Sequence, residues 1–278
     1  VKIDSLKTAS TTLLDTLFGE EETVDQVAVS ITPYNMFVNV GSDRTDWLTG
    51  FDPAAYGAEG WAGCVEARAG DLDRSDDAAT PFQAVLNPTP NPSDGINSRC
   101  PESEILPLTS NRTTLQDHID DLEADYGTMT NVGLTWGWRT ISENWQGKWD
   151  GDVEPADYDD ADTVKAIVFM TDGVADWGPV WYSAYGHLAE GRLGTTNETQ
   201  AEQEIDDRLL ESCNVAKGDG IEIYTVMFAL DSAPPSVEAT YRACATSDAH
   251  FFDAATGAEL EAAFSQIAGR LTSLRLTQ

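Results

Sequence analysis

Basic residues are scarce in this chain of 278 residues, in which 16 Lys and Arg stand against 48 Asp and Glu, a formal net charge of −32. A surface of that sign repels nucleic acid and anionic membranes, so neither is expected as a partner. Divalent cations and basic protein surfaces remain compatible with it. No run of about 18 apolar residues occurs, so no segment of this chain is predicted to span a membrane.

Histidines are also few, and the sequence holds only His118, His187 and His250. They fall in an expected helix, an insertion and a short strand, and none lies in a recognisable catalytic motif. The four cysteines form no CxxC, so a zinc site is not expected either. With no nucleophile–base pair in view, a binding or structural protein is favoured over an enzyme.

The cysteines leave their pairing open. Cys64 and Cys100 lie in one loop-rich segment, and Cys213 and Cys244 lie near the C-terminus. These two pairs are plausible, but four cysteines allow three pairings and spacing alone does not choose among them. Disulfides would place the protein outside the cytosol. Four buried free thiols are the alternative.

The most informative stretch covers residues 164–176, which begins with the nearly continuous apolar run VKAIVFM. Such a run is typical of a strand that is buried on both faces of a parallel sheet. It ends in Thr171, Asp172 and Gly173. A carboxylate at the carboxyl end of a buried parallel strand lies where open α/β sheets bind ligands. Considered alone, the same three residues are explained equally well as a polar turn.

Helical and strand patterns alternate along the rest of the chain. Apolar residues recur at helical spacing in residues 2–18, 110–125, 201–217, 237–244 and 257–274, and a further helix is expected after Gly127. Strand-like runs occupy residues 26–31, 36–40, 221–228 and 250–252. This alternation predicts an α/β fold, with a doubly wound, mostly parallel sheet flanked by helices.

Three loop-rich insertions are expected in this fold, at about residues 42–104, 143–162 and 175–200. The first is rich in Gly, Pro, Asp and Asn, with aromatic residues to pack it. Residues 71–77 resemble the start of a calcium loop, but Asp76 stands where glycine is needed and Phe82 where glutamate is needed. A solvated acidic loop is therefore the better interpretation. We expect residues 1–278 to form a single domain.

Several segments together resemble a von Willebrand factor A domain. They are QVAVSITPYN at residues 26–35, GTMTNVGLTWGWR at 127–139, VKAIVFMTDG at 164–173, and C-x-x-A-K-x-x-G-I-x-I-Y-T-V from Cys213. More narrowly, the chain resembles the TadG-like proteins linked to Tad/Flp pilus assembly in bacteria. The WAGC at residues 61–64 and the Cys-Pro at Cys100 are shared with that group.

The resemblance implies a metal-ion-dependent adhesion site at the carboxyl edge of the sheet. Such a site would hold Mg²⁺ or Ca²⁺, with Mn²⁺ as a further option, and leave one position open for a carboxylate from a protein partner. Thr128 matches the family's loop threonine, Asp172 matches its aspartate, and Thr130 lies next to them. Hard oxygen ligands suit these cations. Helix capping alone explains the two threonines as well.

The chain departs from the family at the DxSxS motif, which would lie on a first, mid-sheet strand just upstream of residue 2. Asp4 and Ser5 do not replace it, because they fit the helix that follows the motif. We therefore expect the domain to be incomplete at its N-terminus. A longer precursor, a bound cleaved fragment or a neighbouring subunit would supply the strand.

The resemblance thus predicts a bacterial binding module that is extracellular, at the cell surface or periplasmic, and acts in adhesion or in pilus or filament assembly. It also leads us to expect the disulfides Cys64–Cys100 and Cys213–Cys244. A structural surface or filament subunit without a working metal site is the alternative. A metal-dependent hydrolase is less favoured, and the sequence does not identify the ligand.

Overall fold

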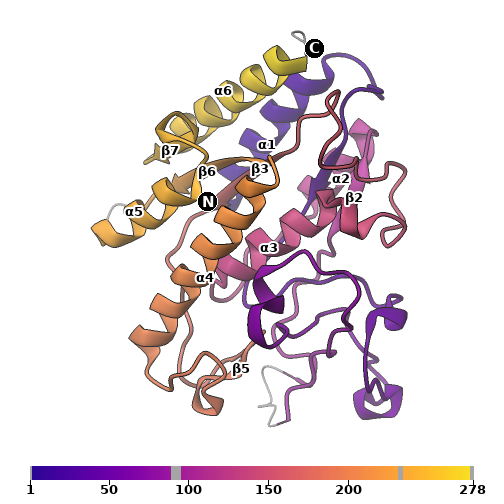
Figure 1. Cartoon of the computed structure of the whole chain (residues 1–278), viewed down its shortest axis with the longest axis vertical. Helices are drawn as coiled ribbons and strands as arrows, with labels where there is room; N and C mark the ends of the chain where they lie inside the picture. The colour runs from indigo at the N-terminus through magenta and orange to yellow at the C-terminus, as the bar shows by residue number, and fades with distance from the viewer. Residues whose placement is uncertain (1, 89–94, 231–233, 276–278) are drawn as a thin grey trace.

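The computed structural model describes residues 2–88, 95–230 and 234–275, and its centre is a parallel sheet in the order β3–β6–β7 (Figure 1). The strands are β3 (Ala166–Thr171), β6 (Glu222–Phe228) and β7 (Phe251–Ala254). Strand β3 pairs with β6 in unbroken register, from Ala166 opposite Glu222 to Thr171 opposite Met227. Six of the seven residues of β6 are buried, as expected for a strand between two parallel neighbours.

Helices cover both faces of this sheet. On one face lie α1 (Lys2–Phe18) and α6 (Gly257–Arg275), which run side by side (Figure 1). Tyr224 and Val226 of β6 pack there against Phe264 of α6. On the other face lie α3 (Thr130–Ile141), α4 (Glu198–Gly218) and α5 (Pro235–Cys244), against which Ile223 and Met227 pack. The α/β architecture predicted from the sequence is confirmed.

A second, smaller pairing joins β1 (Val29–Ile31) and β2 (Leu106–Thr109), which are antiparallel and lead into α2 (Arg112–Asp120). The expected buried strand at 26–31 is therefore only three residues long and half-buried, because β2 is its one neighbour among the described strands. Helix α2 is shorter than residues 110–125. Its N-cap is Asn111, whose side chain accepts a hydrogen bond from the Thr114 amide.

The prediction of a strand at residues 36–40 is wrong. Met36, Val38 and other residues of this stretch are fully buried, but they belong to no strand, and a single bridge joins Asn39 to Cys64. Two asparagine side chains bend the backbone here. Asn35 accepts from the amide of Phe37, and Asn39 accepts from the amide of Gly41. Such local bonds compete with a strand ladder for the same amides.

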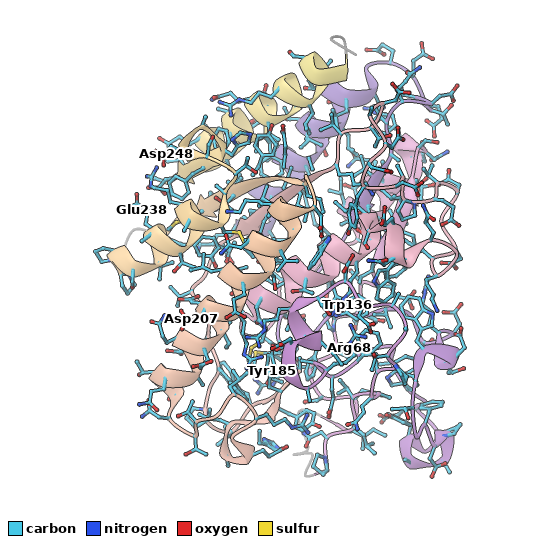
Figure 2. All side chains as sticks on the ribbon, in the orientation of Figure 1. Arg68, Trp136, Tyr185, Asp207, Glu238 and Asp248 are labelled. Atoms are coloured by element: carbon cyan, nitrogen blue, oxygen red, sulfur yellow. A yellow bond between two sulfur atoms is a disulfide. The ribbon has the colours of Figure 1, made fainter. Side chains whose placement is uncertain are left out.

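The insertions pack around a tryptophan cluster, formed by Trp47, Trp136, Trp145 and Trp149. Arg139 of α3 joins this cluster to the first insertion. Its guanidinium lies 4.6 Å from the ring centroid of Trp136 and donates to the backbone oxygens of Leu72 and Ser75. Burial lowers the pKa of Arg139 to about 9. Figure 2 shows Arg68, Trp136 and Tyr185 in this part of the molecule. A further pairing is a hairpin of β4 (Tyr182–Ser183) and β5 (Gly186–His187).

The interpretation of residues 71–77 as a solvated acidic loop is wrong at three positions. Asp73 is buried, forms an ion pair with Arg208 and accepts a hydrogen bond from the Tyr185 hydroxyl. The neighbouring acids are also partnered: Asp77 pairs with Arg68, and Asp76 accepts from the hydroxyls of Ser142 and Tyr158. Several of the chain's few arginines are thus used to neutralise carboxylates that the fold buries.

Both disulfides join the expected cysteines. Cys64–Cys100 closes the first insertion, and Cys213–Cys244 links α4 to α5. Cys213 and Cys244 are fully buried, so this bond is part of the packing on one face of the sheet.

Replacing Cys213 and Cys244 together with alanine should lower the free energy of unfolding by about 3–4 kcal/mol. A cross-link over 31 residues removes that much conformational entropy from the unfolded chain. Urea unfolding of the oxidised parent and the double variant measures the difference. Equal stability of the two proteins, or a free thiol in non-reducing peptide mapping of the parent, would contradict the pairing.

Candidate functional site

The candidate site lies where β3 ends, at Thr171, Asp172 and Gly173. The buried Thr171 hydroxyl donates to the backbone oxygen of Gly173 at 2.8 Å and accepts from the Gly173 amide. This closes the turn and leaves the Asp172 side chain exposed. Lys2, at the start of α1, donates to the backbone oxygen of Asp172 at 3.0 Å, and its ammonium lies 3.6 Å from the carboxylate. With both side chains about half exposed, this ion pair contributes little to stability.

Thr128 lies beside this turn. The Asp176 amide donates to the backbone oxygen of Thr128 at 3.1 Å and so joins the loop before α3 to the loop after β3. A β-carbon added to Gly173 would lie 3.3 Å from the Thr128 hydroxyl oxygen. The structure therefore brings Thr128 next to the Asp172–Gly173 turn. Glycine is the residue that leaves the threonine room at this approach.

Thr130 is the first residue of α3 and is fully buried. Its hydroxyl oxygen has no partner of good hydrogen-bond geometry within the part of the chain that the structure describes, but it interacts with the neighbouring hydroxyl of Tyr241. The N-cap residue of α3 is Met129, which makes no side-chain capping bond. The start of α3 is therefore not capped by the side chain of its N-cap residue. The Thr130 hydroxyl faces the buried Tyr241 hydroxyl in the same layer as Thr171, which also interacts with Tyr241.

The side chains of these three residues are of the chemical type that binds a divalent cation. One carboxylate and two hydroxyls are hard oxygen donors of the sort that Mg²⁺ and Ca²⁺ prefer. They are few, however, and among the described residues no group of three or more His, Cys, Asp or Glu side chains is placed to hold a metal ion. Asp172, Thr128 and Thr130 therefore fit part of a cation's ligand set and leave the rest to be supplied.

Carboxylates of neighbouring segments form an acidic group that the sequence analysis missed. Glu202 and Asp206 lie one turn apart on α4, and Asp176 follows the candidate turn. Burial, then the charges of Asp207 and Glu202, raise the pKa of Asp206 to about 6. Burial also raises the pKa of Glu202 and that of Asp176. The sequence does show Glu202 and Asp206 four positions apart on a predicted helix, and like charges at this spacing lie on the same helix face.

Two tyrosines, the buried Tyr241 and the half-buried Tyr34, lie between this acidic group and the end of β3. Burial and the Asp206 charge both raise the pKa of Tyr241, whose ring stacks on Phe169 of β3 at 5.9 Å. Tyr34 stacks on the same phenylalanine at 5.7 Å, and its hydroxyl donates to the backbone oxygen of Met170. The Asp206 charge therefore acts on Tyr241 across a largely buried aromatic layer, where it is less screened than in water.

Exposed apolar side chains border the site. Tyr126 is 58% exposed and Val180 is 75% exposed, and Val174 also reaches solvent. The Arg99 guanidinium lies 5.1 Å from the ring centroid of Tyr126 and 4.7 Å from that of Trp181, so it joins the two loops that carry these residues. We refer to Tyr126, Val174, Val180 and Trp181 as the edge patch.

One hydroxyl–imidazole pair is present away from this site. The Ser247 hydroxyl lies 2.7 Å from Nδ1 of His250, whose Nε2 lies 3.8 Å from Glu222. The His250 amide also donates to the Ser247 backbone oxygen at 2.8 Å. Both contacts close the short helical turn that leads into β7. The pair is thus accounted for by local structure.

No protein-family model and no curated protein matches the chain. Among solved structures, the pilus adhesin SpaC from Lactobacillus rhamnosus GG, in its open conformation, is similar over 97% of this chain and 28% of its own, with 14% identity and a TM-score of 0.49. The proximal thread matrix protein 1 of the mussel byssus is similar over 96% of this chain and 41% of its own, with 10% identity and a TM-score of 0.43.

A third similar structure, the conserved hypothetical protein BatB from Bacteroides thetaiotaomicron, matches over 98% of this chain and 89% of its own, with 10% identity and a TM-score of 0.42. Likenesses of this size say nothing about ligands or partners. As for membranes, none of the helices in the described ranges is long and apolar enough to cross one.

Replacing Asp206 with asparagine should stabilise the protein at neutral pH. Because folding raises the pKa of Asp206 from 3.8 to about 6, the folded state binds its proton more tightly than the unfolded state does. The charged carboxylate therefore costs stability above pH 6, and this cost disappears as the pH falls toward 4. We expect a gain on the order of 2 kcal/mol at pH 7.5 and little difference at pH 4.

Urea unfolding of the parent and variant across this pH range measures the effect. Glu204→Gln, which removes one charge from the same helix, is the matched control. If Asp206→Asn and Glu204→Gln change stability equally at every pH, the assigned burial of Asp206 is wrong.

Proposed function

We propose that the chain is a binding module of the von Willebrand factor A type, which acts outside the bacterial cytosol in adhesion or in the assembly of a pilus or filament. The narrower part of the proposal is a TadG-like role linked to Tad/Flp pili. Its site is the carboxyl end of β3, and its ligand is a protein partner that presents a carboxylate to a divalent cation. No catalytic step is proposed.

The observation that supports this proposal is the approach of Thr128 to the Asp172–Gly173 turn. Residues more than 40 positions apart in sequence bring one hydroxyl beside the turn that carries one carboxylate, and Thr130, two residues after Thr128, begins α3. Asp172 would supply the charged ligand, and the two threonines would supply neutral oxygens. A cation held by so few protein charges keeps a strong attraction for a carboxylate from outside.

The edge patch supports a macromolecular partner. Tyr126, Val174 and Val180 are three of the six most exposed large hydrophobic residues among those described, and all three belong to the loops that carry Thr128 and Asp172. Apolar side chains around a charged centre are typical of protein-binding surfaces. The net charge of −32 would repel an acidic partner over longer distances, so the cation is needed to admit its carboxylate.

Localisation outside the cytosol is supported by the two disulfides, because such bonds persist in oxidising compartments. They are compatible with the cell surface, the periplasm and the extracellular space alike.

A structural subunit without a working metal site is the second candidate function. It is favoured by the scarcity of acidic ligands at the site, where the described residues form no metal-binding group. In that case the edge patch would still bind a neighbouring subunit, but cations would have no effect on the binding.

Asp172→Ala should weaken the binding of Mg²⁺ or Ca²⁺ by more than roughly tenfold, since it removes the one carboxylate of the proposed ligand set. Isothermal titration of residues 1–278 with each cation measures this. Asp159→Ala is the matched control, because Asp159 is an exposed aspartate in the loop before β3. Thr128→Val should weaken binding while preserving side-chain size.

Far-ultraviolet circular dichroism should show that each variant remains folded. If the parent binds a cation and Asp172→Ala binds it as well as Asp159→Ala does, Asp172 is not a ligand and the proposed site is wrong. If the parent binds neither cation, residues 1–278 form no working metal site, as the second candidate requires.

A further inference from the structure

Lysine is rare in this chain, and one of its lysines lies at the candidate site. The sequence has five lysines against 48 acidic residues. The ammonium groups of Lys7, Lys165 and Lys217 donate to backbone oxygens. Among the residues that the structure describes, Lys2 is the one lysine that forms an ion pair with a carboxylate, and its partner is Asp172. The carboxylate assigned to the cation site is thus the one that a lysine neutralises.

The Lys2 ammonium is held by two oxygens of the same residue. Its Nζ donates to the backbone oxygen of Asp172 at 3.0 Å and lies 3.6 Å from the Asp172 carboxylate. Carboxylate and carbonyl oxygens are also the ligands that Mg²⁺ and Ca²⁺ take in proteins. The ammonium and a divalent cation would therefore draw on the same carboxylate.

Asp172 is open to solvent as well as to Lys2. The sequence predicts that β3, which leads to it, is buried on both faces, and the structure corrects this, because the alternating Ala166, Val168 and Met170 are only half-buried. At the end of the strand, the side chains of Lys2 and Asp172 are 46% and 49% exposed. An ion from solution can therefore reach the carboxylate, and the lysine side chain has room to leave it.

The positive charge of Lys2 matters more than the strength of its contact. An exposed ion pair is weak, so a divalent cation can displace it. The displaced ammonium stays tethered close by, however, and repels a second positive charge. For charges of +1 and +2 about 5 Å apart in water, this repulsion corresponds to roughly a five- to tenfold loss of affinity at low salt.

We propose that Lys2 is a built-in competitor for the candidate cation site. Its ammonium neutralises Asp172 while no divalent cation is bound, and it raises the concentration of Mg²⁺ or Ca²⁺ at which the site fills. An acidic surface attracts cations over its whole area, so a fixed positive charge at this carboxylate keeps the site from filling at low concentrations. This inference rests on the proposed function, because it concerns the regulation of the same site.

The test is isothermal titration of residues 1–278 with Mg²⁺ and with Ca²⁺ at low salt. Lys2→Met keeps the length of the side chain and removes its charge, and we expect it to bind roughly five- to tenfold more tightly than the parent. Lys7→Met is the matched control, because Lys7 lies on the same helix and its ammonium contacts the backbone oxygen of Asp120. Lys2→Arg keeps the charge and should bind no more tightly than the parent.

Two further measurements show how Lys2 acts. At about 500 mM KCl the advantage of Lys2→Met should fall to roughly twofold or less, because screening then extends over only a few ångströms. In an Asp172→Ala background, Lys2→Met should give no gain, since the carboxylate for which the ammonium competes is absent.

Equal affinities of Lys2→Met and Lys7→Met would overturn the inference, and so would a gain that persists in the Asp172→Ala background. If Asp172→Ala weakens binding while Lys2→Met leaves it unchanged, the inference is wrong and the proposed site stands. If the parent binds neither cation but Lys2→Met binds one, Lys2 closes the site and the inference holds. If neither protein binds a cation, both the inference and the metal site are wrong.

Discussion

The pairing of β3 with β6 is the interaction on which the rest of the structure depends. The six paired residues fix where β3 ends relative to β6, and therefore where the turn at Asp172 lies. The same ladder fixes the two faces on which α1 and α6, and α3, α4 and α5, pack. Because parallel strands contribute their carboxyl ends to one edge, loops distant in sequence meet there. Thr128 reaches Gly173 for this reason.

Much of this arrangement could be predicted from local patterns. Helices α1, α4 and α6 follow from apolar residues at helical spacing, and β3 and β6 follow from their apolar runs, because each such pattern is decided by neighbours in sequence. The stretch at residues 36–40 has a strand-like pattern too, but Asn35 and Asn39 take its amides. The sequence shows those asparagines and does not show which way their side chains turn.

The candidate site, too, could be predicted only in part from the sequence. Asp172 and Thr128 could be singled out through the family resemblance, and the structure puts Thr128 beside the turn that carries Asp172. The burial of Asp73 could not be predicted, since its partner Arg208 is 135 residues away. Nor could the raised pKa of Asp206, because it depends on how deeply α4 packs against the sheet. Long-range pairing of charges is decided by tertiary structure and leaves little trace in local sequence.

The two disulfides have a mechanical consequence. A chain pulled at its ends gains length as it unfolds, but residues inside a covalent loop do not contribute to that gain. Cys64–Cys100 spans 36 positions and Cys213–Cys244 spans 31. At about 3.3–3.6 Å per residue, these loops withhold roughly 120 Å and roughly 100 Å from the extended contour. The first loop encloses most of the first insertion, so Phe82 and Trp136, whose rings pack against each other, differ under load: Trp136 lies on the path that bears force, whereas Phe82 lies inside the loop and is shielded from it.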